Sequence, residues 1–144
     1  MTREEASRLL SQFARNVLCR TPHITYNASY VDVDGADMTL MPYIKDAYEL
    51  GIFKGHKGMF RPKDMITQQE FASAVMRLLT HNIDTEMTAT WWESYQSIAK
   101  TMGLFDASFW DADNNVRKEA IYKLFSAYKN YDYTRESYGY VITQ

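Results

Sequence analysis

Cysteine is nearly absent from this 144-residue chain, which contains only Cys19. A single cysteine cannot form an internal disulfide, so a small fold held together by disulfides is excluded. The sequence also has no apolar run near the roughly 20 residues that a membrane-spanning helix requires. Since 16 basic residues nearly balance 18 acidic ones, there is no excess of positive charge for binding nucleic acid through its phosphates.

Signatures of catalysis and of metal binding are also missing. The three histidines are isolated in predicted loops, and there is no glycine-rich phosphate loop and no nucleophile motif. Two acidic stretches, 32–37 and 111–115, resemble calcium loops at first sight. The second has Val116 and Tyr122 where an EF-hand needs glycine and glutamate. The sequence therefore predicts a protein that is not an enzyme and has neither a cofactor nor a metal site.

Apolar residues are frequent enough for a folded core, at 46% hydrophobic and 15% aromatic. They recur at helical spacing behind two capping boxes, Thr2 with Glu5 and Thr67 with Glu70. The pattern predicts a mainly α fold in which Gly51 and Gly103 form left-handed helix ends. The predicted helices cover about 2–18, 40–50, 67–79, 91–102 and 116–128, and Asn114 or Asn115 replaces Val116 as the cap of the last.

The order of these elements repeats along the chain, and a repeat sets the whole fold. A shift of 52 positions brings identical residues of the second and third copies together: Tyr43 and Tyr95, Ala47 and Ala99, Gly51 and Gly103. The first copy consists of a closing helix alone, and the third is three residues shorter than the second. We predict one domain over 1–144, divided into a partial repeat 1–29, repeats 30–82 and 83–129, and a tail 130–144.

The second copy is the most complete and carries a series of motifs. They are Tyr30-Val31-Asp32-Val33, a short helix ending in Leu50-Gly51-Ile52, Gly58-Met59-Phe60-Arg61-Pro62, and Ile66-Thr67-Gln68-Gln69-Glu70. This series resembles the S-layer homology (SLH) repeat. The resemblance implies a pseudo-threefold bundle of repeated helix–loop–helix units, in which Asp32 organises a loop.

The resemblance also implies a function and a site. SLH domains anchor proteins by binding cell-wall-linked polysaccharide, often carrying ketal-pyruvate groups, in grooves between repeats. Family members place an arginine at a helix start and an aromatic residue on the first helix. The matching residues here, predicted to bind the ligand, are Arg3, Arg117, Gln68 in place of the second arginine, and Trp92. A sugar carboxylate suits a guanidinium beside free helix amides.

Several residues have a simpler interpretation beside the functional one. Arg3 and Arg117 fit equally well as surface cations paired with neighbouring glutamates, and Tyr43 and Tyr95 fit the core. The tyrosine-rich tail is predicted to be extended, with its most strand-like part at 138–142. It either packs back across the helices or is offered to another subunit. The second choice favours an assembly subunit that associates with itself or with other proteins.

The start of the chain bears on where the protein acts. It opens directly into a helix cap and lacks the apolar region of a signal peptide. Together with the missing front half of the first repeat, this favours a fragment or mature form of an exported chain. We expect a location at the cell surface, with cell-wall polysaccharide as the partner and with neither nucleic acid nor a membrane span.

Overall fold

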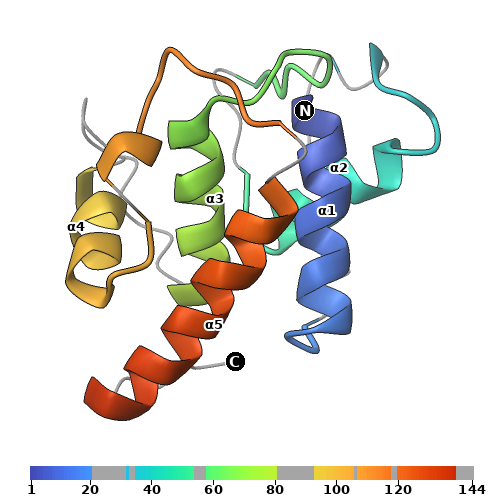
Figure 1. The fold of residues 1–144 in the computed structure, drawn as a ribbon. Helices are drawn as coiled ribbons and strands as arrows, with labels where there is room; N and C mark the ends of the chain where they lie inside the picture. The colour runs from blue at the N-terminus through green and yellow to red at the C-terminus, as the bar shows by residue number, and fades with distance from the viewer. Residues whose placement is uncertain are drawn as a thin grey trace. The chain divides into compact units, whose positions relative to one another are not determined.

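The computed structural model describes residues 1–20, 32, 35–53, 58–80, 93–105, 107–117 and 120–138. This part of the chain is mainly helical and contains no strand. It holds five α-helices and a 3₁₀ turn, in the order α1 (Arg3–Asn16), α2 (Met41–Glu49), α3 (Gln68–Thr80), α4 (Glu93–Met102), η2 (Ala107–Phe109) and α5 (Ala120–Tyr138) (Figure 1). Backbone contacts divide the chain into two compact units, 1–66 and 67–144.

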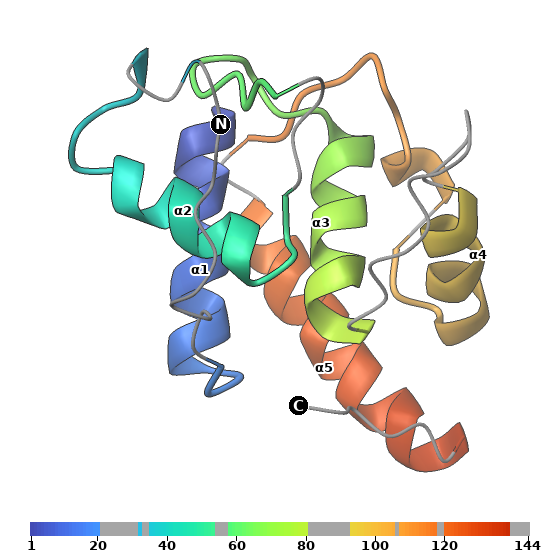
Figure 2. The ribbon, with the colours of Figure 1, turned by 180° about the vertical axis from the view of Figure 1, so that it is seen from behind.

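The first unit consists of α1, α2 and the loops that follow them. The capping box predicted for α1 is confirmed, because the Thr2 hydroxyl accepts from the Glu5 amide and the Glu5 carboxylate accepts from the Thr2 amide. Pro42 lies in the first turn of α2, where its missing amide costs nothing. The helix α2 lies against α1 (Figures 1 and 2). Their buried apolar residues are Ala6, Leu10, Phe13, Ala14, Ile44 and Ala47.

The helices α2 and α4, which are the first helices of the second and third repeats, end in the same way, as the sequence predicts. Gly51 and Gly103 have φ angles of 74° and 66°, the left-handed conformation that terminates a helix. The residue after each glycine donates its amide back into the helix, Ile52 to the Ala47 carbonyl and Leu104 to that of Ala99, both at 2.9 Å. The two copies therefore share a structural motif as well as a sequence pattern.

The second unit is built around α3, in which every residue from Phe71 to Leu79 is buried. The helix α4, the turn η2 and α5 pack on it. Tyr95 of α4 is fully buried, as predicted. The aromatic residues of the 104–110 segment complete this core, with Phe105 stacked on Phe109 at 5.2 Å and Phe109 edge-on to Phe71 at 6.5 Å between ring centroids.

Two predictions about the last helix and the tail are wrong. The helix α5 begins at Ala120, since Val116 and Arg117 are not helical, and it continues to Tyr138, well past the predicted end. No glycine or proline interrupts the chain between Val116 and Gly139, so nothing stops the helix earlier. Tyr131 is buried at helical spacing after Leu124 and Ala127, so this tyrosine belongs to a helix face. The rest of the predicted strand, 139–142, lies outside the described residues.

The prediction that Tyr43 belongs to the core also needs correction. Tyr43 is only partly buried at the edge of α2, whereas its repeat partner Tyr95 is fully buried. The hydroxyl of Tyr43 accepts a hydrogen bond from Gln12 at 3.3 Å. The hydroxyl of Tyr43 thus takes part in an exposed polar contact.

Candidate functional site

Arg3, the first residue of α1, is buried and contacts the loop of its own unit. Its side chain is only 4% exposed, and Nε donates to the Phe60 carbonyl at 2.8 Å. The guanidinium carbon lies 5.1 Å from the Phe53 ring centroid and 5.0 Å from that of Phe60. A cation over two aromatic rings is attracted by their negative faces. Arg3 therefore joins the start of α1 to the loop that carries Phe60.

Asp32 organises that same loop, as the resemblance implies. Its carboxylate accepts the amide of Phe60 at 2.8 Å and that of Arg61 at 2.7 Å. Desolvation alone would raise the pKa of Asp32, but these two hydrogen bonds outweigh it and leave the pKa below its usual value. Arg61 has a positive φ of 61°, a conformation that non-glycine residues seldom adopt. The carboxylate of Asp32 stabilises the backbone at this strained turn.

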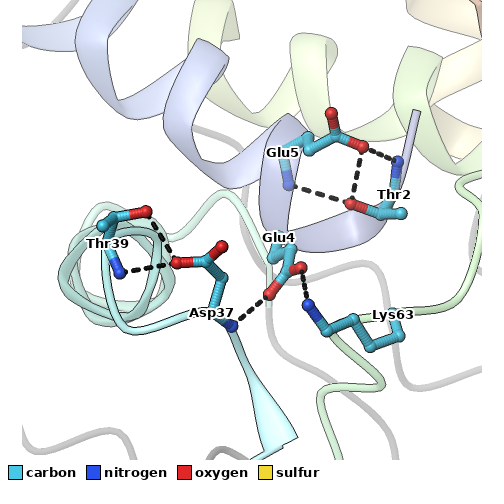
Figure 3. A network of polar contacts seen from close by, with 6 residues as sticks. All are labelled: Thr2, Glu4, Glu5, Asp37, Thr39 and Lys63. Atoms are coloured by element: carbon cyan, nitrogen blue, oxygen red, sulfur yellow. Dashed lines mark hydrogen bonds and ion pairs between the residues drawn. The ribbon is translucent and has the colours of Figure 1, made fainter.

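A polar network surrounds the start of α1 (Figure 3). The Glu4 side chain is buried, and its two oxygens accept from Lys63 Nζ at 2.7 Å and from the Asp37 amide at 2.9 Å. Asp37 in turn accepts from the amide and the hydroxyl of Thr39. The hydrogen bond to Glu4 raises the pKa of Lys63, and the bonds from Thr39 lower that of Asp37. The buried carboxylate of Glu4 thus anchors two separate loop segments, one with Asp37 and one with Lys63, at the start of α1.

The backbone amides at the helix starts are already occupied, contrary to the expectation of an open anion site. In α1, the amide of Arg3 donates to the Asp64 carbonyl at 2.9 Å and that of Glu4 to the Pro62 carbonyl at 3.1 Å. In α3, the amides of Gln68 and Gln69 donate to carbonyls of the loop before α5. Sequence reasoning missed these pairs because the acceptors lie roughly 40 to 60 positions away and carry no local signal.

The helix caps at Thr2 and Thr67 share a backbone arrangement, and this arrangement shows where Arg117 lies relative to a cap. The cap Thr2 forms an antiparallel bridge with Met65, and the cap Thr67 forms one with Asn115. By this correspondence Val116, which is buried like Ile66, stands one residue before the cap position. Arg117 lies in the loop and is exposed, so its prediction at a helix start is wrong.

The predicted ligand-binding residues fall into three groups. Gln68 and Arg117 belong to the two segments of the second unit that meet at the Thr67–Asn115 bridge, so the structure brings these segments together. Arg3 belongs to the first unit and is buried. Trp92 lies outside the described residues. Their role in binding stays a prediction.

In the acidic stretch 111–115, which resembles a calcium loop in sequence, the Asp111 side chain accepts hydrogen bonds from its own loop. Asp111 accepts the Asp113 amide at 2.7 Å and also a hydrogen bond from the Asn114 side chain. These bonds, the one from the Asp113 amide foremost, lower the pKa of Asp111. Across the described ranges, no group of three or more His, Cys, Asp or Glu side chains is arranged to hold a metal ion.

Lys63 is a residue that the sequence gives no reason to single out. Its side chain is 61% exposed while its ammonium group is held by Glu4, which lies 59 positions earlier. The cation is therefore both oriented and accessible at the edge of the polar network. This property of Lys63 follows from its tertiary contact with Glu4.

The described residues are mainly helical, and in each unit a helix-cap threonine forms a backbone bridge with a loop. Residues 29–72 match the family model of the S-layer homology domain. This segment is therefore similar to S-layer homology domains, which generally act as cell-wall anchoring modules at the cell surface. No curated protein and no solved structure matches the chain. None of the helices in the described ranges is both long and apolar enough to cross a membrane.

Proposed function

We propose that this chain holds its protein at the cell surface by binding cell-wall-linked polysaccharide without catalysing a reaction on it. The observation that carries the proposal is the family match over 29–72. The same segment contains Asp32, which holds the loop at Phe60, and the capped start of α3.

The proposed contact region in the second unit is the edge formed by Gln68 and Arg117. Arg117 is exposed and carries a permanent charge, so it suits an acidic group on the polysaccharide. Gln68 offers an uncharged amide beside it. Trp92 is proposed as the aromatic surface for a sugar ring.

Arg3 enters the proposal in a different way. Because its guanidinium is buried against Phe53 and Phe60, it acts by holding the loop of the first unit in place. An exposed cation at that end of α1 is Lys63. We propose Lys63 as the residue that meets an acidic sugar there, with its orientation set by Glu4.

The test is a calorimetric titration of the chain with purified wall polysaccharide. Arg117→Gln should weaken binding roughly tenfold or more, since a charge-assisted hydrogen bond contributes about 1.5–3 kcal/mol. Lys100→Gln, which removes an exposed positive charge from α4 in the same unit, is the matched control and should bind like the wild type. Binding should also weaken as salt is added. Equal affinity of the two variants would contradict the role of Arg117.

An assembly function is the second candidate, because α5 exposes large apolar side chains. Ile121, Tyr122 and Phe125 are all accessible to solvent. Such a surface favours contacts with protein over contacts with sugar hydroxyl groups.

A further inference from the structure

The large apolar side chains that the first unit exposes are of one chemical kind. Among its described residues they are all methionines: Met38 at 85%, Met59 at 43% and Met65 at 55% exposure. Those exposed by the described residues of the second unit are an isoleucine, a tyrosine and a phenylalanine. Methionine differs from isoleucine and phenylalanine in having a thioether sulfur, which oxidants convert to a sulfoxide.

Other methionines of the described residues are far less accessible. Met76 of α3 is fully buried, and Met102 of α4 is only 5% exposed. Met1 and Met41 are partly buried. An oxidant dissolved in water reaches a sulfur atom according to its exposure. The fold therefore separates methionines that meet an oxidant at once from methionines that are protected by the core.

The backbone on both sides of Met38 is held by polar contacts. The amide of Asp37 donates to the buried Glu4 carboxylate at 2.9 Å, and the amide of Thr39 donates to Asp37 Oδ1 at 2.8 Å (Figure 3). None of these bonds involves the thioether of Met38. A change at its sulfur atom therefore leaves this loop in place.

The backbone at the other two exposed methionines is fixed in a similar way. Phe60, which follows Met59, donates its amide to the Asp32 carboxylate at 2.8 Å. The backbone of Met65 forms an antiparallel bridge with the helix cap Thr2. The Met65 sulfur makes one long contact, 3.8 Å from the terminal amino group of the chain, and a sulfoxide oxygen is a better acceptor for that donor.

The effect of a sulfoxide on stability depends on where it forms. In the core, its polar oxygen would be buried without a hydrogen-bond partner, which is costly. At an exposed position, water solvates the same oxygen. Oxidation at the exposed methionines of the first unit should therefore leave the fold intact, whereas oxidation of a buried methionine such as Met76 would disrupt the packing around α3.

We propose that Met38, Met59 and Met65 consume oxidants, each reducing one molecule of a peroxide without loss of the fold. The thioether sulfur attacks one oxygen of hydrogen peroxide, so that an S–O bond forms and the O–O bond breaks. A proton moves from the transferred oxygen to the departing one, which leaves as water. The sulfur gives up two electrons, and these reduce the peroxide. This activity does not depend on the binding of polysaccharide.

The test is peptide mapping by mass spectrometry during treatment of the full chain with dilute hydrogen peroxide. Met38, Met59 and Met65 should each gain oxygen at least about tenfold faster than Met76 and Met102, because exposure governs the rate. The melting temperature should stay unchanged while these three sulfur atoms are oxidised. Equal rates at exposed and buried sulfur atoms in the folded chain would overturn the proposal.

Leucine variants test whether these sulfur atoms are the ones that consume the oxidant. A chain with Met38→Leu, Met59→Leu and Met65→Leu keeps apolar side chains of similar size, and its intact mass should gain one oxygen fewer for each methionine removed. Met102→Leu is the matched control and should take up as much oxygen as the wild type. Met38→Leu alone gives the same comparison if the combined variant does not fold.

Two results with the combined leucine variant would contradict the proposal. The first is an uptake of oxygen equal to that of the wild type, since other groups would then consume the peroxide. The second is a melting temperature that peroxide lowers in the wild type and leaves unchanged in the variant. Oxidation of the exposed methionines would in that case damage the fold.

Discussion

At the scale of single residues, the charged side chains Arg3, Glu4 and Arg77 are buried and matched to specific partners. Arg3 and Arg77 are both about 5% exposed, and both lie over aromatic rings while Nε donates to an oxygen. Glu4 accepts from an ammonium group and an amide. Burial of a charge is costly unless it is paired in this way. Substitution of these residues should therefore affect folding before it affects binding.

The loss of stability on substitution by glutamine should be much larger at Arg3 than at Arg117. Arg3→Gln removes the ring contacts and the hydrogen bond to Phe60, and should lower the free energy of unfolding by about 2 kcal/mol. Arg117→Gln changes an exposed side chain and should stay within about 0.5 kcal/mol of the wild type. Urea denaturation of both variants measures this. Similar losses in the two would show that Arg3 has no special structural role.

Gly103 isolates the effect of backbone conformation. An added Cβ would meet no heavy atom within 4 Å, yet φ is 66°. Gly103→Ala should therefore cost about 1 kcal/mol for the left-handed conformation alone. Gly35 also has open space around it but no positive φ, so Gly35→Ala is the control and should cost nothing measurable. The comparison is made by thermal melts, and a Gly103→Ala melt that matches the control would refute the assignment.

The carboxylate of Asp32 should make the folding stability depend on pH. Its pKa in the folded protein is depressed because the amides of Phe60 and Arg61 outweigh desolvation. A depressed pKa means that the stabilisation is complete above the unfolded-state value, near 3.8, and is lost as pH falls through the lower folded value. Asp32→Asn should thus be less stable than wild type by about 1 kcal/mol at neutral pH. The gap should shrink below pH 4, and a gap that is constant with pH would contradict the charge-based account.

At the scale of elements, local signals predict helix ends well and long-range pairing poorly. Capping boxes at Thr2 and Thr67 and glycines after two helices are confirmed. The sequence predicts the start of α5 too early. The third repeat has no Ser, Thr or Asp with a partner glutamate to mark the cap. The occupied amides of α1 could not be foreseen, since their acceptors, Asp64 and Pro62, are distant in sequence.

The cap at Thr67 should contribute measurably to α3. Its hydroxyl accepts the Glu70 amide at 3.1 Å and donates to the Glu70 carboxylate at 3.0 Å. Thr67→Ala should lower stability by about 1 kcal/mol. Thr101→Ala removes a hydroxyl that only bonds back to the Ser97 carbonyl within α4, and it should change stability by less than about 0.5 kcal/mol. A loss that is equal for both threonines in denaturant titrations would show that the cap is not special.

At the scale of the whole molecule, the repeat was the most informative feature of the sequence. It predicted the mainly α fold, which the structure confirms in the described residues, and the resemblance to the S-layer homology repeat, which the match over 29–72 supports. It did not predict the burial of Arg3 or the oriented Lys63, because both depend on contacts that bring distant loops to the start of α1.

The most direct measurement for the whole account is co-sedimentation of the chain with purified bacterial cell walls. Walls that retain their linked polysaccharide should carry the chain into the pellet, and walls chemically stripped of it should leave the chain in solution. Free polysaccharide should compete the bound chain away. Equal sedimentation with intact and stripped walls, or none with either, would contradict anchoring through the polysaccharide.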